Sequence, residues 1–328
     1  MLRTAVIGAG HLGKQHARIH SSLASEGSSQ FVSVCDIKED VAKLIASEHG
    51  TDWTTDWRSL KGCVDAVSLA VPTESHCDIA CALLESGIHV LVEKPISRTL
   101  EEADRMIASA KKGRAVLQVG HGERFNPALV ALQPHVRNPV YFEIHRIGQF
   151  TARSLDIDVV LDLMIHDLDI VQWLVGEDVE VTGLHAVGIP ILTDRVDAAN
   201  ARLEFATGAV ANITASRVGT EKIRKMRFFQ PRDYVTVDYV TNHASISNLA
   251  PSAGAGAWPG VRTKVLEVQN VEPLRGEIEA FLGAAANGSE PPVPGEDGRR
   301  ALALALRALE QIHQHTVRSG VSAFLGKA

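Results

Sequence analysis

The chain has 328 residues, 45% hydrophobic and 22% charged, which is typical of a globular protein with two domains. Its 33 basic and 39 acidic residues give a formal charge of −6, which argues against nucleic acid and against an anionic membrane as partners. No stretch approaches the length of a membrane span, and the first strand-like run starts at Leu2 with no signal segment before it. We therefore expect a cytoplasmic protein that acts on a small molecule.

Short apolar runs alternate with amphipathic stretches up to about Val119. The runs predict five strands, at residues 5–7, 31–35, 66–70, 89–92 and 115–119. Strands that alternate with helices form a parallel sheet covered on both faces. Four cysteines lie in this part of the chain without Cys-x-x-Cys spacing, which argues against disulfides and structural zinc and favours buried, reduced thiols.

A glycine-rich turn follows the first predicted strand and leads into a helix-compatible stretch, with glycines at Gly8, Gly10 and Gly13. Glycine serves there for a tight turn, for close approach to a pyrophosphate and for helix–strand contact, while free amides at the helix N-terminus hold phosphates. Asp36 ends the second strand, where its carboxylate can accept hydrogen bonds from the adenosine ribose and repel a 2′-phosphate. We expect NAD in preference to NADP, although Lys38 would soften the repulsion. Asp36 can also cap the following helix.

Two further turns follow strands at the same edge of the predicted sheet. Glu93-Lys94-Pro95 stands where the fourth apolar run ends, and ligand crevices of open α/β sheets form at such strand ends. A lysine there can serve as a cation, a hydrogen-bond donor or a proton carrier; the alternative is a solvated turn with a surface ion pair. Thr73 and His76, after the third run, can either begin the next helix or contact the cofactor.

The pattern changes after His121. A strongly helical stretch at residues 159–175 is followed by segments of alternating polarity at 199–205, 209–216 and 234–239, which predict an antiparallel or mixed sheet with one exposed face. Residues 250–260 predict a surface loop, and residues 287–298 predict a connection before the closing helix.

The helical stretch carries Asp162 and His166, four residues apart and hence on one helix face, with Asp169 one turn further along. A carboxylate beside an imidazole orients the ring and raises its pKa, as a general base that takes a hydroxyl proton requires. The alternatives are an ordinary stabilising pair on the helix and half of a metal site, which no further cluster of ligands completes.

Together these motifs resemble the Gfo/Idh/MocA family of nicotinamide-dependent oxidoreductases. The resemblance is carried by residues 8–13, 70–76, 93–95, 118–121, 124–127, 162–169 and 293–298. It implies an α/β protein, with a dinucleotide-binding Rossmann domain at residues 1–121 and a substrate-binding and oligomerisation domain of α+β type, built on a large open sheet, at residues 122–328. It also implies a homodimer or homotetramer that oxidises or reduces sugars, inositols or related polyols.

The resemblance implies roles for individual residues. Lys94 reaches the reacting hydroxyl and the nicotinamide, His166 accepts the proton, and Asp162 binds the substrate hydroxyl or supports His166. Pro95 shapes its turn, if need be through a cis bond. The implied cofactor-binding residues are Gly8, Gly10, His11, Leu12, Gly13, Asp36, Ala70, Pro72, Thr73, His76, Glu93, Lys94 and Pro95. The implied substrate-binding residues are Lys94, Arg124, Asn126, Asp162 and His166, and no metal is implied.

One departure bears on the substrate. Many family members carry a glycine cluster just before the Asp…His segment, and residues 154–161 of this chain contain no glycine. This argues against a simple inositol or free glucose. The form of residues 162–169 is similar to the branch that contains UDP-N-acetylglucosamine 3-dehydrogenases, which implies oxidation at C3 of that sugar nucleotide.

Five basic residues crowd into one short stretch, as a site for an anionic diphosphate would require: Arg217, Lys222, Arg224, Lys225 and Arg227. A solvated strand or an oligomer contact is the slightly favoured alternative. Two other functions remain open, a dehydrogenase of a free sugar or inositol and a non-catalytic regulator that senses NAD or a sugar. The joint presence of Lys94, Asp162 and His166 favours an enzyme.

Overall fold

The computed structural model describes residues 1–149, 157–250 and 260–320, and the chain forms two compact units. Unit 1 comprises Met1–Gly122 and Glu272–Leu302, and unit 2 comprises Glu123–Val271 and Ala303–Ala328. The sequence-based division at residue 121 assigned Glu272–Leu302 to the second domain. That segment instead returns to unit 1, because its helix buries an apolar face against the sheet of unit 1.

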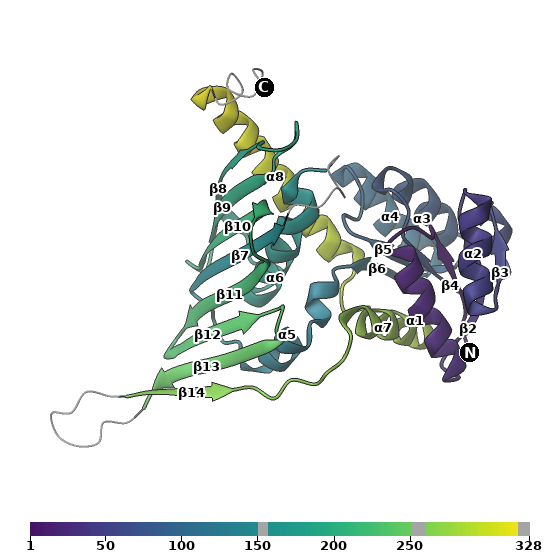
Figure 1. Ribbon diagram of the computed structural model, residues 1–328, viewed down its shortest axis with the longest axis horizontal. Helices are drawn as coiled ribbons and strands as arrows, with labels where there is room; N and C mark the ends of the chain where they lie inside the picture. Colours follow the sequence, from purple (N-terminus) through teal and green to yellow (C-terminus); the bar gives the residue numbers. More distant parts are fainter. Residues whose placement is uncertain (150–156, 251–259, 321–328) are drawn as a thin grey trace. The chain divides into compact units, whose positions relative to one another are not determined.

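Unit 1 is built on a six-stranded parallel sheet in the order β3-β2-β1-β4-β5-β6 (Figure 1). Its strands are β1 (Arg3–Ile7), β2 (Gln30–Cys35), β3 (Asp52–Thr54), β4 (Ala66–Leu69), β5 (His89–Glu93) and β6 (Leu117–Gly120). The five predicted strands are confirmed, since their continuous apolar runs suit burial on both faces. The sequence missed β3, which has only three residues, two of them exposed.

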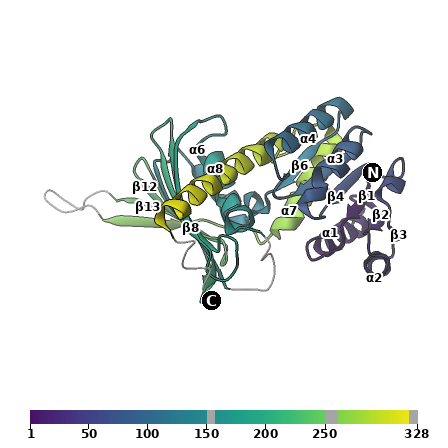
Figure 2. The ribbon, with the colours of Figure 1, turned by 90° about the horizontal axis from the view of Figure 1, so that it is seen from above.

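Helices cover both faces of this sheet. Helices α3 (His76–Leu84) and α4 (Leu100–Gly113) lie side by side on one face, and α1 (Gly13–Ser25), α2 (Glu39–His49) and α7 (Pro273–Asn287) cover the other (Figure 2). Phe281 of α7 is fully buried in a cluster that also contains Leu23 of α1 and Leu91 of β5. This burial holds the returning segment in unit 1.

Unit 2 is built on an eight-stranded sheet in the order β14-β13-β12-β11-β7-β10-β9-β8, in which β7 and β10 are parallel and the other neighbours antiparallel. This confirms the large mixed sheet. Its strands are β7 (Tyr141–Gln149), β8 (Val181–Ile189), β9 (Ala198–Phe205), β10 (Val210–Gly219), β11 (Ile223–Gln230), β12 (Asp233–Asp238), β13 (His243–Leu249) and β14 (Val261–Val265).

Helices pack on one face of the eight-stranded sheet, and side chains along the strands alternate between buried and exposed. The helical stretch predicted at 159–175 begins with a π-helical turn, Val160–Met164, and continues as α6 (Ile165–Val175). Helix α5 (Pro127–Leu132) packs near β12 and β13. Helix α8 (Gly295–Ser319) starts inside the stretch predicted as a connection, and most of the loop predicted at 250–260 lies outside the described residues.

The four cysteines are free thiols, as expected, but they are not all buried. Cys35 and Cys77 are buried, Cys81 is half-buried and Cys63 is exposed, because Cys63 lies in the turn before β4. Within the described ranges, every helix falls short of the length and apolarity that a membrane crossing requires.

Replacing Phe281 by Ala is expected to lower the free energy of unfolding by about 3–5 kcal/mol, because the ring leaves a cavity between α7 and the sheet. Urea denaturation measures the change. Gly283→Ala on the same helix is the control: its added Cβ meets no atom within 4 Å, so it should be neutral or stabilise by up to about 1 kcal/mol. An unchanged stability of Phe281→Ala would contradict this packing of α7.

Candidate functional site

The three positions Gly8, Gly10 and Gly13 in the turn between β1 and α1 are glycine for different physical reasons. A Cβ on Gly8, whose φ is +87°, would lie 2.5 Å from the carbonyl oxygen of Ala70, and a Cβ on Gly13 would lie 1.6 Å from that of Gly8. The fold itself therefore requires glycine at both positions. A Cβ on Gly10 would meet no atom within 4 Å, and Gly10 is exposed. The open space at Gly10 fits the close approach of a dinucleotide pyrophosphate.

The start of α1 is suited to an anion. No side chain caps this N-terminus, and the first turn carries no acidic residue. The amides of a helix N-terminus favour negative charge. His11 and Leu12, which precede the helix, are exposed at this turn.

Asp36 connects the glycine turn to the end of β2. Its carboxylate accepts hydrogen bonds from the backbone nitrogens of Ala9, at 2.8 Å, and Lys38, at 2.8 Å. Helix α2 begins at Glu39 without a side-chain cap, so the helix-capping alternative for Asp36 is wrong. A half-buried carboxylate with about four acceptor positions keeps room for ribose hydroxyls after these two bonds.

His76 holds two turns of unit 1 together. It is buried, and its ring nitrogens lie 2.9 Å from the carbonyl oxygen of Val71 and 3.1 Å from that of Pro95. Burial lowers its pKa below the ordinary histidine value, against the effect of these carbonyls. Thr73 opens a short 3-10 turn, and α3 then begins at His76 without a side-chain cap, so Thr73 does not cap that helix.

Lys94 directly follows β5 and is half-buried, and the Lys94–Pro95 peptide bond is cis. The preceding Glu93 accepts a hydrogen bond at 2.8 Å from Nε2 of His16, on α1. Burial alone would raise the pKa of Glu93, but the hydrogen bond from His16 and the charge of Lys94 lower it below its ordinary value. Glu93 is therefore a carboxylate beside Lys94. His16 was not predicted from the sequence, although its place one turn after Gly13 was an available signal.

A second buried carboxyl group approaches Glu93 from α7. Glu277 is 2% exposed, and among the described residues its Oε1 has no hydrogen-bond partner. Burial and the charge of Glu93 raise the pKa of Glu277 well above its ordinary value. Its backbone oxygen accepts a hydrogen bond at 3.0 Å from Nε2 of Gln118, on β6. No sequence signal pointed to Glu277, which is far from Glu93 along the chain.

In unit 2, Asp162 and His166 lie on either side of the junction between the π-helical turn and α6, and both are half-buried. The backbone nitrogen of Asp162 donates to the carbonyl oxygen of Asp158 at 3.0 Å. Asp169 lies one turn further along α6. It is 2% exposed and accepts hydrogen bonds from Nε of Arg124, at 2.8 Å, and Nη2, at 2.6 Å.

Arg124 and Asn126, for which the resemblance implies substrate binding, make well-defined contacts within unit 2. The Arg124 side chain is 4% exposed, engages Asp169 through two nitrogens and stacks at 5.3 Å over the ring of Trp173. Oδ1 of Asn126 accepts a hydrogen bond at 3.0 Å from the Ala128 nitrogen and so caps α5. Both side chains therefore join elements of unit 2 to one another, and their contact with substrate stays a prediction.

A buried arginine on β7 was also not predicted from the sequence. Arg146 is 2% exposed and donates from Nε and Nη2 to Asp167, at 2.7 and 2.8 Å, and from Nη1 to Glu123, at 2.6 Å. Burial opposes its charge, but these two carboxylates raise its pKa well above the ordinary value. The pair fixes α6, and with it His166, to the sheet.

Gly10→Ala is expected to retain the thermal stability of the wild type, because its Cβ enters open space, and to weaken NADH binding by about tenfold or more. Titration of NADH fluorescence measures the affinity. Gly13→Ala is the contrasting variant, since its Cβ collides with backbone and must lower Tm. Equal NADH affinities of Gly10→Ala and wild type would contradict the pyrophosphate assignment.

Replacing Glu277 by Gln is expected to stabilise the protein relative to the wild type, by an amount that increases as pH rises. The raised pKa means that the folded state keeps a proton that the unfolded chain releases above its ordinary pKa, so wild-type stability falls by up to about 1.4 kcal/mol per pH unit until the folded pKa is reached. Glutamine has no such proton. Melting curves between about pH 5 and pH 8 measure the difference.

Glu279→Gln makes the same change at an exposed position on the same helix and serves as the control for the substitution itself. A difference between Glu277→Gln and wild type that stays constant with pH would contradict a protonated Glu277.

Comparison with known proteins agrees with this geometry. Residues 2–121 match an oxidoreductase family with an NAD-binding Rossmann fold, and residues 101–229 match the GFO/IDH/MocA C-terminal domain. The UDP-N-acetylglucosamine 3-dehydrogenase of Acidithiobacillus ferrooxidans is 38% identical over 99% of this chain and 98% of its own length. The inositol 2-dehydrogenase of Rhizobium meliloti is 27% identical over 95% of this chain and 97% of its own length.

Solved structures give the same result. A structure of the Acidithiobacillus ferrooxidans enzyme matches with a TM-score of 0.87 at 38% identity, covering 95% of this chain and 97% of that one. Levoglucosan dehydrogenase in complex with NADH and levoglucosan shares the fold, with a TM-score of 0.83 at 20% identity over 95% of this chain and 97% of that one. The chain thus belongs to the Gfo/Idh/MocA family of NAD-binding oxidoreductases.

Proposed function

We propose that this protein is a dehydrogenase that oxidises the C3 hydroxyl of UDP-N-acetylglucosamine with NAD. The observation that carries the proposal is the 38% identity to a UDP-N-acetylglucosamine 3-dehydrogenase, which extends over 99% of this chain and so includes both units. The inositol 2-dehydrogenase of Rhizobium meliloti is only 27% identical over a similar length, which makes a free inositol the weaker candidate. A regulator without turnover would not need a proton-transfer set.

Three residues are proposed to act on the substrate. His166 takes the proton of the hydroxyl as general base, and Asp162 holds that hydroxyl or orients the imidazole. Lys94 stabilises the negative charge that develops on the oxygen, and the Glu93 carboxylate lies beside it. A bound nicotinamide dinucleotide supplies the hydride acceptor.

NAD is proposed over NADP because of Asp36. Its carboxylate is fixed by two backbone amides at the end of β2, where the adenosine ribose binds in this fold. A 2′-phosphate would approach this negative charge, whereas two hydroxyls can donate to it. His76, Pro72, Thr73 and Ala70 are proposed to line the same edge of the sheet.

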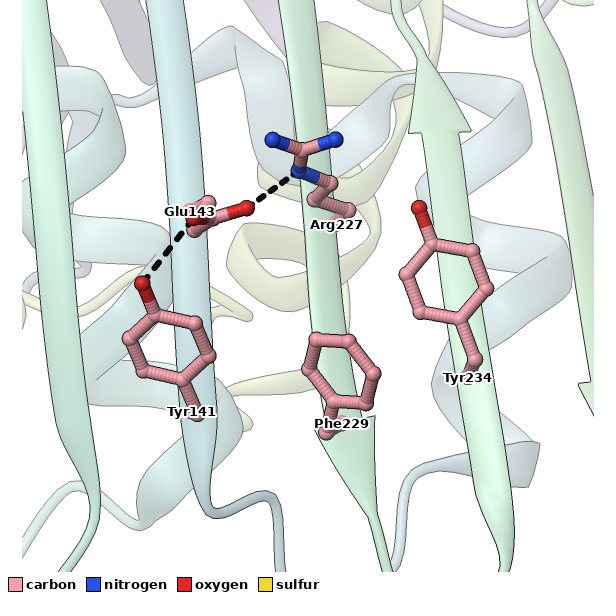
Figure 3. A pocket seen from close by; sticks show the side chains of 5 residues that line it. All are labelled: Tyr141, Glu143, Arg227, Phe229 and Tyr234. Carbon is pink, nitrogen blue, oxygen red and sulfur yellow. Dashed lines mark hydrogen bonds and ion pairs between the residues drawn. The ribbon is translucent and has the colours of Figure 1, made fainter.

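The exposed face of the eight-stranded sheet is proposed to join copies of this chain into a homodimer or homotetramer. Figure 3 shows a hollow on this face lined by Tyr141, Phe229 and Tyr234, with Glu143 and Arg227 paired beside them. Phe229 is 45% exposed, and the ring centroids of Phe229 and Tyr234 are 4.9 Å apart. Exposed aromatic side chains of this kind are typical of interfaces.

Lys94→Ala is expected to lower kcat for UDP-N-acetylglucosamine by about 100-fold or more, since it removes the cation at the reacting oxygen, and to leave NADH affinity largely intact. The absorbance of NADH measures turnover, and fluorescence measures binding. Lys112→Ala, which removes an exposed lysine of α4, is the control and should behave as wild type. Near-normal turnover of Lys94→Ala would contradict its proposed role.

A further inference from the structure

The five basic residues between Arg217 and Arg227 do not form one patch. Along β11 the side chains alternate, so Arg224 lies on the face of the buried Met226 and Phe228, while Lys225 and Arg227 lie on the exposed face. There Lys225 pairs with Asp238 at 3.5 Å and Arg227 pairs with Glu143. These two cations already have carboxylate partners.

Arg217 is also engaged within the fold. It is buried, its Nε lies 3.7 Å from Asp197, and its Nη2 donates to the carbonyl oxygen of Ile157. It therefore joins β10 to the segment that precedes the π-helical turn. Arg224 and the exposed Lys222 remain as the cations of this stretch that can meet a ligand on the helix-covered side.

Arg224 is incompletely paired. Its register partner on β7 is Arg146, whose guanidinium takes the Asp167 carboxylate and the nearer contact with Glu123, at 2.6 Å. Arg224 reaches the same Glu123 oxygen only at 3.5 Å, and this is its one hydrogen bond among the described residues. Its side chain is 37% exposed, and this bond uses one of its five N–H donors.

The electrostatic surroundings of Arg224 differ from those of the other arginines. Burial and the positive charge of Arg146 lower the pKa of Arg224, whereas every other arginine with a resolved shift in the described ranges has a raised pKa. In most of the others, a carboxylate partner outweighs the effect of burial. An additional anion beside Arg224 would therefore be stabilised.

The position of Arg224 relative to Asp162 indicates which anion. Arg224 is the register partner of Arg146, and Arg146 binds Asp167, the neighbour of His166 on α6. The charge of Asp162 also acts on the Arg224 guanidinium, so these groups share one region of unit 2. In a nucleotide sugar, the diphosphate is attached to C1, two ring carbons from C3. A residue that binds the diphosphate must lie within one sugar ring of the residue that binds the 3-hydroxyl.

We propose that Arg224, assisted by Lys222, binds the diphosphate of a nucleotide-sugar substrate whose ring is held by Asp162 and His166. This inference rests on the proposed function, since it assigns the anionic part of the same substrate. The planar guanidinium of Arg224 can donate parallel hydrogen bonds to phosphate oxygens. These charged hydrogen bonds keep their strength because the site is partly shielded from water. Free sugars and inositols carry no anionic group for Arg224.

The test compares Arg224→Gln with Lys225→Gln, the neighbouring residue on the opposite face of the strand. Arg224→Gln should raise KM for UDP-N-acetylglucosamine by about 10- to 100-fold with a much smaller change in kcat and no change in NADH affinity. Lys225→Gln should keep the wild-type KM. Arg224→Lys, which keeps the charge but loses the planar guanidinium, should fall between the two and serves if the glutamine variant does not fold.

Calorimetric titration with UDP separates this proposal from the proposed function. If the wild type does not oxidise UDP-N-acetylglucosamine, the proposed function fails, and UDP binding still decides the role of Arg224. Weaker UDP binding by Arg224→Gln or Arg224→Lys than by Lys225→Gln supports the diphosphate site. Two results would overturn the diphosphate site. One is an unchanged KM together with an unchanged UDP affinity in the folded Arg224 variants. The other is a loss of UDP affinity in Lys225→Gln as large as that in the Arg224 variants.

Discussion

The buried contacts of Arg146 position the functional side chains of unit 2. A buried charge loses several kcal/mol of hydration, and this is offset only when its partners are well placed and saturate its donors. Asp167 and Glu123 do so with contacts of 2.6 to 2.8 Å. Neighbouring helical residues point about 100° apart, so with Asp167 turned into the core, the adjacent His166 is turned toward a half-buried surface. Because Arg146 makes the closer contact with Glu123, Arg224 has only a long hydrogen bond to the same carboxylate.

In unit 1, the glycines that the fold requires can likewise be distinguished from the one that a ligand requires. Gly8 and Gly13 are fixed by backbone contacts of the fold, whereas nothing in the fold excludes a side chain at Gly10. Beyond the turn, His76 links the segments that follow β4 and β5, and His16 links α1 to Glu93. Lys94 therefore stands on a strand end that is held from several directions.

The sequence predicted the sheet of unit 1 well, because strands buried on both faces leave continuous apolar runs. It did not reveal that Arg124 pairs with Asp169, since the two residues lie 45 apart along the chain. The sequence pattern also placed Arg224 and Lys225 in one basic group. That they lie on opposite faces of β11 can be predicted only when the strand and its buried face are known. Glu277 could not have been found, because its importance arises from the return of α7 to unit 1.

The assigned chemistry is tested most directly by the ratio of kcat/KM values for UDP-N-acetylglucosamine and myo-inositol, measured on the wild-type protein with NAD, together with identification of the oxidised carbon in the product. We expect a large preference for the nucleotide sugar and a 3-keto product. Equal or greater efficiency with myo-inositol, or oxidation at another carbon, would contradict the assignment.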